Sequence, residues 1–377
     1  MTAKRESDLA RLWRHRPGRE LVGMAEDVFM AKWKEGCRPL VLKWANTENG
    51  AWMMVHLPPA MTFREFEACG EAVGDYSKTA VEIRREGDCI ELEMYRSEMQ
   101  DTYPFEFDPA KYKKMVLPAH FGIDRSFRPA VYDLVDAPHV LIGGNTGLGK
   151  SNLLHTIAAS VLVSRRAHVV IFDPKILEFA YLENYADVFT DDNSVTGGLK
   201  WLNNEMDKRL RRLKKGKVVK FQNYKEEILP VVVIIDELAE LNKESQKLLY
   251  RLLRMGRAVG ISVVAAIQRP SSTTFDGQKF GDIKFLFRCR VCFACDSINS
   301  GMVLDNNHAT YLDEIPGRCV VQWGSEKEVQ NFFLPPDDEE ITAPILAQSK
   351  GVKLFGTEQL ADRQGQRQAD FVRSGTL

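Results

Sequence analysis

The sequence predicts an α/β fold with a mainly parallel sheet, preceded by a small α+β domain. Near-continuous apolar runs at residues 167–172, 231–235 and 261–267 are typical of strands that are buried on both faces. Segments with leucines at helical spacing, at residues 199–213 and 248–253, alternate with these runs. Because buried strands alternate with helices, we expect parallel pairing within one sheet.

The composition is that of a globular protein from a reducing compartment. The chain has 377 residues, of which 44% are hydrophobic and 27% charged, so it can hold two domains with a substantial core. No apolar run approaches the roughly 18 residues that span a bilayer, and no signal peptide is evident. Seven cysteines in a chain of this length favour a cytoplasmic location over a disulfide scaffold.

The chain divides into four expected regions. These are a basic N-terminal arm, a small α+β adaptor domain, a larger α/β domain and a polar, flexible tail, at residues 1–35, 36–114, 115–335 and 336–377. The arm contains a basic segment at residues 11–19, which could touch nucleic acid or anionic lipid, although a solvated arm is the more common outcome. The tail begins acidic and stays polar, which is typical of extended segments with at most a short helix.

The small domain shows strand and helix signals without a catalytic constellation. Residues 51–57 are strand-like and end at two prolines. The capping box of Thr62 and Glu65 predicts the start of a helix. Alternating apolar residues on both sides of a turn at residues 86–88 predict a hairpin. We therefore expect an adaptor or assembly module.

A glycine-rich segment joins a predicted strand at residues 139–143 to a helix that begins near Lys150. From Gly144 it matches G-x-x-x-x-G-K-[ST], the phosphate-binding loop of nucleoside triphosphatases, although a chance strand–helix turn is the alternative. Glycines allow backbone N–H groups to surround phosphate oxygens, and the helix N-terminus faces the same anion. We expect ATP and Mg²⁺ as cofactors, with Lys150 at the β- and γ-phosphates and Ser151 on the metal. The other expected nucleotide contacts are Gly144, Asn145, Thr146, Gly147, Leu148, Gly149 and Asn152.

The apolar run at residues 231–235 ends in two carboxylates and has the Walker B form. Asp236 suits a Mg²⁺ partner, and Glu237 suits a general base that polarises the attacking water. Gln268 ends the next apolar run and could sense the γ-phosphate or orient that water. The alternatives are a strand followed by a capping acid, and a polar residue leaving a strand. Because ligands bind at the carboxyl ends of parallel strands, these catalytic side chains are expected at one sheet edge.

Three cysteines, Cys289, Cys292 and Cys295, have the spacing C-x-x-C-x-x-C, which is also a metal-binding pattern. They fall in an apolar stretch at residues 285–295 that reads as a strand. Alternation along a strand would place Cys292 on the face opposite to the other two. Buried structural cysteines are therefore favoured over a metal site.

Five segments, in their order and spacing, resemble the FtsK/SpoIIIE family of DNA translocases. They lie at residues 138–147, 173–175, 235–241, 257–261 and 268–271. A later stretch at residues 299–305, with Gly317, is similar to the family's C-terminal motor segment. The resemblance covers about residues 115–335, and the small domain is similar in kind to the one that precedes these motors.

The resemblance implies a RecA-like P-loop ATPase that forms a ring, usually a hexamer, and pulls double-stranded DNA through its pore. It places Asp236, Glu237 and Gln268 at the family's Walker B and sensor positions. The family often has arginine where this chain has Gly301, so the arginine finger that a neighbouring subunit supplies is unassigned. The candidates for that finger are Arg257, Arg288 and Arg290.

Two features typical of the cell-division members are not found in the sequence, namely a transmembrane anchor and a winged-helix domain. We therefore expect a member carried by a mobile element, such as a plasmid or conjugative element, with a membrane-bound or relaxase partner.

A basic cluster supplies a contact for DNA that does not depend on the resemblance. Eight cations occur between residues 208 and 220 with no acid among them. Such a cluster neutralises phosphates without reading sequence, whereas the alternative is a solvated helix end. The candidate DNA contacts are Lys214, Lys215 and Lys217. The loop at residues 271–284 is a second candidate, facing the pore.

Two other functions remain open. A coupling ATPase of type IV or type VII secretion would use the same motor on a protein substrate. A scaffold with a degenerate nucleotide site is disfavoured because Lys150, Asp236 and Glu237 are all intact.

Overall fold

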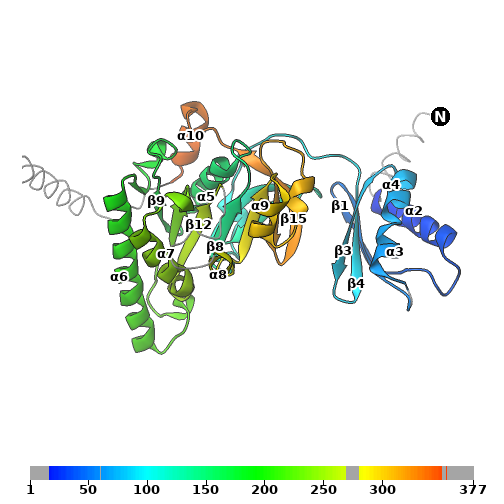
Figure 1. Cartoon of the computed structure of the whole chain (residues 1–377), viewed down its shortest axis with the longest axis horizontal. Coiled ribbons are helices and arrows are strands. Elements are labelled where there is room, and N and C mark those ends of the chain that lie inside the picture. Colours follow the sequence, from blue (N-terminus) through cyan, green and yellow to red (C-terminus); the bar gives the residue numbers. More distant parts are fainter. Residues whose placement is uncertain (1–16, 60, 269–279, 350–353, 355–377) are drawn as a thin grey trace, which may run out of the picture. The chain divides into compact units, whose positions relative to one another are not determined.

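The computed structural model describes residues 17–59, 61–268, 280–349 and 354 (Figure 1). It divides into two compact units. The first comprises residues up to 100 together with 123–128, and the second comprises 101–122 and the residues from 129 onward. Over the described residues, no helix is both long and apolar enough to cross a lipid bilayer.

The first unit is an antiparallel sheet with helices packed on one face (Figure 1). Among the residues described there, the strand order is β1-β2-β4-β3, with β1 Leu40–Thr47, β2 Gly50–His56, β3 Ala80–Glu86 and β4 Cys89–Tyr95. The helices are α2 Pro17–Lys32, α3 Phe63–Glu67 and α4 Gly70–Ser77. The predicted hairpin is present as β3 and β4, and the Thr62 backbone N–H donates to the Glu65 carboxylate at 2.7 Å, which completes the capping box.

The second half of the expected N-terminal arm is folded, which corrects the expectation for residues 17–32. These residues form α2, and Leu21, Ala25 and Phe29 are buried in the core of the first unit. Their spacing of four residues places them on one face of a helix, which a search for basic residues overlooks. The basic segment at residues 11–19 lies largely outside the described residues.

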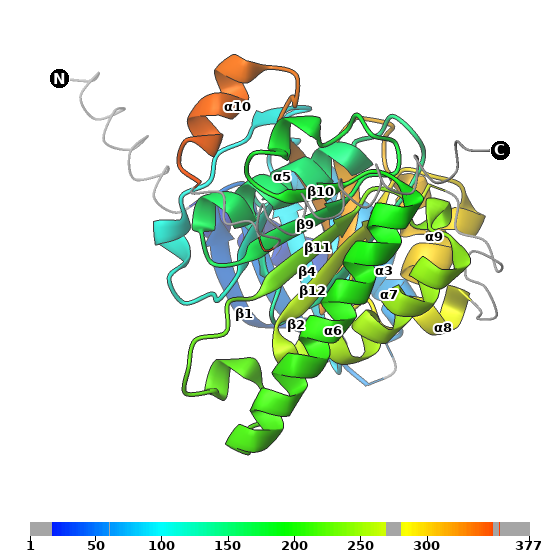
Figure 2. The ribbon, with the colours of Figure 1, turned by 90° about the vertical axis from the view of Figure 1, so that its left-hand side faces the viewer.

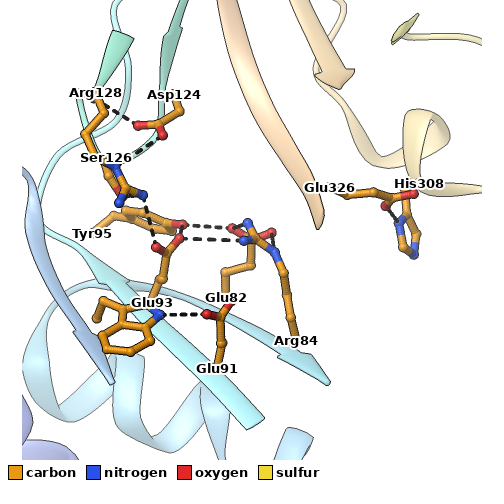
Figure 3. A network of polar contacts seen from close by, with 11 residues as sticks. Glu82, Arg84, Glu91, Glu93, Tyr95, Asp124, Ser126, Arg128, His308 and Glu326 are labelled. Atoms are coloured by element: carbon orange, nitrogen blue, oxygen red, sulfur yellow. Dashed lines mark hydrogen bonds and ion pairs between the residues drawn. The ribbon is translucent and has the colours of Figure 1, made fainter. Parts of the chain in front are cut away.

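A buried carboxylate cluster ties the tip at residues 123–128 into this unit (Figure 3). Glu93 Oε2 accepts a hydrogen bond from the Tyr95 hydroxyl and lies 3.8 Å from Arg84 Nη1. Glu93 Oε1 lies 3.3 Å from Arg128 Nη2, which belongs to the tip. Both oxygens of this carboxylate therefore have partners, as a stable buried charge requires.

The second unit is built on a mixed sheet. Its described residues supply eleven strands in the order β10-β9-β11-β12-β8-β13-β14-β15-β6-β7, with β5 beside β15. The strands from β10 to β13 in this order run parallel, and β14 and β15 continue the sheet antiparallel. The bounds are β5 Tyr103–Pro104, β6 Pro118–Asp124, β7 Pro129–Asp133, β8 His139–Gly143, β9 His168–Phe172, β10 Asp187–Phe189, β11 Val231–Ile235, β12 Ile261–Ala266, β13 Cys289–Phe293, β14 Arg318–Trp323 and β15 Ser325–Phe333.

The helices of the second unit follow the predicted alternation. They are α5 Lys150–Ser164, α6 Asp192–Gly216, α7 Lys243–Met255, α8 Phe280–Lys284, α9 Ser297–Leu304 and α10 Glu339–Leu346. Helix α6 packs along α7, and the two lie side by side in Figure 2. Short 3-10 turns lie at Pro109–Tyr112, Ala180–Leu182, Phe221–Asn223, Leu238–Glu240, Gly256–Val259 and His308–Tyr311.

The parallel register brings the carboxyl ends of four strands to one edge. Ile235 at the end of β11 pairs with Phe172 of β9 and with Ala265 of β12. Ala266 at the end of β12 pairs with Ile142 of β8. The loops that leave these strands therefore start beside one another, as the sequence predicted.

The expected polar tail begins with an ordered segment. Helix α10 has buried Thr342 and Leu346 and packs against α5. Its N-cap is Asp338, whose side chain accepts from the backbone N–H of Glu340 at 3.0 Å. The short helix that the sequence allowed is thus present, and most of the remaining tail lies outside the described residues.

Candidate nucleotide-binding site

The P-loop at residues 144–151 leaves β8 and enters α5. Gly144, Gly147 and Gly149 have φ angles of +130°, +81° and +110°, which glycine adopts without strain. A Cβ at Gly144 would lie 2.7 Å from the Cβ of Phe293, so this position excludes a side chain. Gly149 is the N-cap of α5, which leaves the first N–H groups of the helix available to an anion.

Lys150 occupies the inside of this loop. Its ammonium donates to the carbonyl oxygens of Gly144 at 2.8 Å and Asn145 at 2.7 Å. Burial lowers the pKa of Lys150, while the nearby carboxylates of Glu237 and Asp236 oppose that shift. The Lys150 side chain therefore ends where the loop curves, at the position that the motif assigns to it.

Ser151 and Asp236 meet across the sheet edge. The Ser151 hydroxyl lies 3.4 Å from Asp236 Oδ1, although the two residues are 85 positions apart in the chain. A hydroxyl and a carboxylate are hard oxygen donors of the kind that Mg²⁺ accepts beside nucleotide phosphates. The pair that the sequence predicted as metal ligands is thus brought together, and it fits that ion.

Lys175 is a member of this site to which the sequence analysis gave no role. Its ammonium lies 2.7 Å from Asp236 Oδ2. Although burial opposes it, the hydrogen bond with Asp236 raises the pKa of Lys175. The loop that presents this lysine is shaped by Asp173, whose carboxylate accepts from the backbone N–H groups of Ile176 and Phe179, each at 3.1 Å. The sequence feature that could have identified Lys175 is its position just after β9, because β9 pairs with β11 and Asp236 follows β11.

Glu237 is a buried carboxylate, and one of its two oxygens has no hydrogen-bond partner among the described residues. Its Oε1 accepts weakly from the backbone N–H groups of Ala239 at 3.3 Å and Gln268 at 3.4 Å. Its Oε2 is buried and has no hydrogen-bond partner within the described part of the chain. Burial raises the pKa of Glu237, and the two backbone donors and Lys175 work against this rise. A carboxylate in this state suits a general base.

Gln268 joins the Walker B segment to the P-loop. Its backbone N–H donates to Glu237, and its side-chain oxygen accepts from the Thr146 hydroxyl at 3.3 Å. The predicted sensor therefore contacts both halves of the site.

A cleft of about 320 Å³ lies between these elements. Most of the predicted residues line it, and Glu178 and Lys175 add a carboxylate and an ammonium that were not predicted. The lining residues are Thr146, Gly147, Gly149, Lys150, Ser151, Asn152, Lys175, Glu178, Asp236 and Gln268. Its walls carry both signs of charge and the P-loop backbone, as a site for a phosphate chain with a cation requires.

Three predicted nucleotide contacts make structural contacts of their own. The Asn145 N–H donates to the Ala294 carbonyl at 3.2 Å. Leu148 packs against the core. The Asn152 side chain donates to the Phe332 carbonyl at 2.5 Å and accepts from Leu334 at 2.9 Å, so it fastens α5 to the end of β15. The sequence motif selects these residues because they lie within or next to the P-loop. It does not show which partners their backbone and side-chain groups contact.

The three arginine-finger candidates differ in exposure and in whether the guanidinium is paired. Arg257 and Arg288 are exposed. Arg290 pairs with the Asp305 carboxylate and donates to the Val303 carbonyl at 3.3 Å, so its guanidinium is held within its own subunit. None of the three lines the described cleft.

The basic cluster is smaller than the sequence suggests. Arg209 is buried and donates to the Val259 carbonyl at 3.1 Å, and Arg212 pairs with Glu226 at 3.0 Å. Lys214 and Lys215 are exposed in the last turn of α6, and exposed Lys217 caps it in a left-handed conformation. The second candidate, the loop at residues 271–284, lies mostly outside the described residues.

The cysteines are placed differently from the prediction. Strand β13 ends at Phe293, so Cys295 lies beyond it and the alternation rule does not apply to this residue. Cys292 Sγ and Cys295 Sγ are 3.5 Å apart, whereas the prediction placed these residues on opposite faces. Cys289, Cys292 and Cys295 are all buried, as predicted.

Curated proteins with related sequences are DNA translocases. DNA translocase SftA of Bacillus subtilis is 32% identical over 276 residues, which cover 67% of this chain and 28% of SftA. DNA translocase FtsK of Borreliella burgdorferi is 34% identical over 218 residues, which cover 52% of this chain and 27% of that protein. The chain therefore spans less than a third of the length of these two relatives.

Solved structures show the same fold. The structure of the pCW3 conjugation coupling protein TcpA, in its monomer form with ATPgS, aligns with a TM-score of 0.60 and 22% identity over 87% of this chain and 99% of that one. EssC (ATPases 2 and 3) of Geobacillus thermodenitrificans aligns with a TM-score of 0.56 and 17% identity over 67% of this chain and 51% of that one. These likenesses confirm the predicted α/β P-loop ATPase fold. Residues 105–231 also match the FtsK/SpoIIIE family model, and the chain therefore belongs, through this domain, to the FtsK/SpoIIIE family of ATPases.

Proposed function

We propose that this chain is the motor subunit of an ATP-driven translocase of double-stranded DNA, which acts in the cytoplasm as a homo-oligomeric ring, a hexamer by the family resemblance. The observation that carries the proposal is that Lys150, Ser151 and Asp236 line one cleft at the sheet edge, beside Gln268, whose backbone N–H contacts Glu237. The DNA substrate is inferred from the translocases to which the sequence is similar.

The predicted residues of the site have separate parts in hydrolysis. The P-loop N–H groups and Lys150 would hold the phosphates, and Ser151 with Asp236 would hold Mg²⁺. When bound, that ion neutralises charge on the β- and γ-phosphates. Glu237 accepts a proton from the attacking water through its free oxygen, and Gln268 couples this base to the P-loop through Thr146.

A partner subunit completes the site in this proposal. No arginine lines the cleft as described, yet charge that develops on the transferred phosphoryl group needs stabilisation. Arg257 and Arg288 are the stronger candidates for a finger supplied from a neighbour, because they are exposed and Arg290 is paired.

DNA contact is assigned to the end of α6. Lys214, Lys215 and Lys217 are exposed in the last turn and at the C-cap of α6, and such groups bind phosphates without reading bases. Transfer of plasmid or conjugative-element DNA, with a membrane-bound or relaxase partner, is the role that we assign to the motor. The likeness to a conjugation coupling protein agrees with that role.

A second candidate function is a secretion ATPase that moves a protein. The fold likeness to the cytoplasmic domain of the type VII secretion ATPase EccC of Thermomonospora curvata, with a TM-score of 0.56 and 19% identity over 67% of this chain and 35% of that one, supports this candidate. ATP hydrolysis measured with and without double-stranded DNA separates the two. A DNA translocase is stimulated by DNA, whereas a protein-secretion ATPase hydrolyses ATP at the same rate in both conditions. An absence of hydrolysis in both conditions, with Mg²⁺ present and over a range of protein concentrations, would refute both motors.

A further inference from the structure

Two buried cysteines lie directly beneath the P-loop. Cys292 Sγ and Cys295 Sγ are 3.5 Å apart, and the chain between them consists of Phe293 and Ala294. Neither thiol has a part in the hydrolysis proposed above. Seven cysteines are present in the chain, and this C-x-x-C pair is the one with a sulfur–sulfur contact among the described residues.

The two intervening residues support the P-loop. The Ala294 carbonyl accepts from the Asn145 N–H at 3.2 Å. Phe293 packs so closely that a Cβ at Gly144 would lie 2.7 Å from its own Cβ, and a Cβ at Gly149 would lie 3.3 Å from its ring. Phe293 is fully buried. The segment between the thiols therefore contacts the loop near both of its ends, so a displacement of this segment would displace the loop.

We propose that Cys292 and Cys295 form a reversible disulfide with low-molecular-weight disulfides as oxidant, and that this disulfide weakens nucleotide binding at the adjacent P-loop. The proposal is a regulation of the proposed ATPase site and rests on that function. Formation of the bond itself does not depend on it.

The geometry explains why oxidation of the two thiols would change the affinity of the P-loop for nucleotide. A disulfide requires about 2.05 Å between the sulfurs, so the two atoms must approach by roughly 1.5 Å. The chain that joins them is held by β13, which pairs with β8 through Cys292 and Gly143, and by the N-cap of α9 at Asp296. Because neither anchor yields easily, the movement falls on residues 293 and 294 and displaces the loop that they support.

The exchange begins at Cys295. This thiol is 8% exposed, whereas Cys292 is fully buried. The hydrogen bond with Cys292 lowers the pKa of Cys295 against the effect of burial, which favours the reactive thiolate. The Cys295 thiolate attacks one sulfur of the small disulfide and releases one small thiol. Cys292 then loses its proton to solvent, attacks the Cys295 sulfur and releases the second small thiol, so two protein thiols are oxidised and one disulfide is reduced.

The test uses the full chain and oxidised glutathione. Trypsin releases residues 291–318 as one peptide, which contains Cys292 and Cys295 and no other cysteine. Mass spectrometry without reduction should find this peptide lighter by two hydrogen atoms. Binding of a fluorescent ATP analogue, measured on the same sample, should weaken about tenfold or more. A dithiol reductant should reverse both changes.

Single substitutions assign the effect to the pair. Cys295→Ala and, as a second variant, Cys292→Ala should bind the analogue normally when reduced and should lose the response to oxidant. Cys319→Ala is the matched control, because Cys319 is also buried, on the neighbouring strand β14. It should keep the full response.

Three results would overturn the proposal. One is a peptide 291–318 without the internal disulfide in a sample whose exposed Cys37 has reacted with the reagent. Another is a complete disulfide with unchanged nucleotide affinity. The third is an equal loss of affinity in both Cys→Ala variants. Failure of the proposed function is seen separately, because it would appear in the reduced protein as hydrolysis that DNA does not stimulate.

Discussion

Two buried carboxylates, one in each unit, show how similar groups serve different ends. Glu93 of the first unit lies among Tyr95, Arg84 and Arg128, and both of its oxygens have partners. Glu237 of the second unit has one oxygen held weakly by two backbone N–H groups and one without a partner among the described residues. Removing one partner from a satisfied buried ion pair destabilises a fold, whereas a buried carboxylate with an unpaired oxygen keeps that oxygen available for reaction. The comparison predicts that the two residues fail in different assays.

The largest expected effect is on hydrolysis at Glu237. Glu237→Gln keeps the shape and both backbone contacts but removes the base, so the rate of ATP hydrolysis should fall by about 10²- to 10⁴-fold. Binding of ATP and the melting temperature should stay near the wild-type values. Hydrolysis at the wild-type rate in this variant would show that another group activates the water.

The converse variant is Glu93→Ala. It leaves Arg84 and Arg128 without their shared partner, so the free energy of unfolding of the first unit should fall by about 2 kcal/mol. The effect should appear in denaturant titrations as a shifted first transition. ATP binding below that transition should not change. If Glu93→Ala kept the wild-type stability and hydrolysed ATP more slowly, the structural role assigned to Glu93 would be wrong.

Lys175 stands between these two cases, because it neutralises Asp236 within the reactive site. Lys175→Met should free the Asp236 carboxylate for the cation. The Mg²⁺ concentration that gives half-maximal binding of an ATP analogue should then fall by up to about tenfold. Lys200→Met is the matched control, since Lys200 forms an exposed pair with Glu244 at the same 2.7 Å distance. An unchanged or higher Mg²⁺ requirement would show that the pair does not compete with the ion.

The smallest expected effect is on DNA affinity. Each phosphate contact contributes about −0.9 to the slope of log affinity against log salt, so replacing Lys214, Lys215 and Lys217 with alanine should flatten that slope by up to ~3. Basal hydrolysis should be unaffected, because these lysines lie outside the cleft.

The matched control for that variant replaces the exposed lysines of another surface, Lys111, Lys113 and Lys114. It should leave the slope unchanged. Equal slopes in both triple variants would remove DNA contact from the end of α6 and assign it to the loop at residues 271–284.

Sequence motifs were sufficient to predict the parts of the site that are formed by residues adjacent in the chain. The P-loop and the Walker B pair are short segments whose backbone and strand-end position define their role, and the structure brings Ser151 to Asp236 as expected. The parallel core could be predicted for the same reason, because strands buried on both faces leave continuous apolar runs.

The remaining features depend on partners that are remote in the chain. Lys175 acquires its role from Asp236, 61 residues later, and Arg209 is withdrawn from the basic cluster by the carbonyl of Val259. Cys292 meets Cys295 because the strand ends between them. A charge or spacing pattern shows that such groups exist, but their partners are set by packing.

The central claim is that this site moves DNA, and displacement of a third strand tests it most directly. A labelled oligonucleotide bound as a triplex to linear double-stranded DNA is released when a motor passes through it. The account predicts release by the wild type with ATP and Mg²⁺, and none by Glu237→Gln, although this variant still binds ATP and DNA. DNA binding with active hydrolysis but no release in the wild type would contradict translocation.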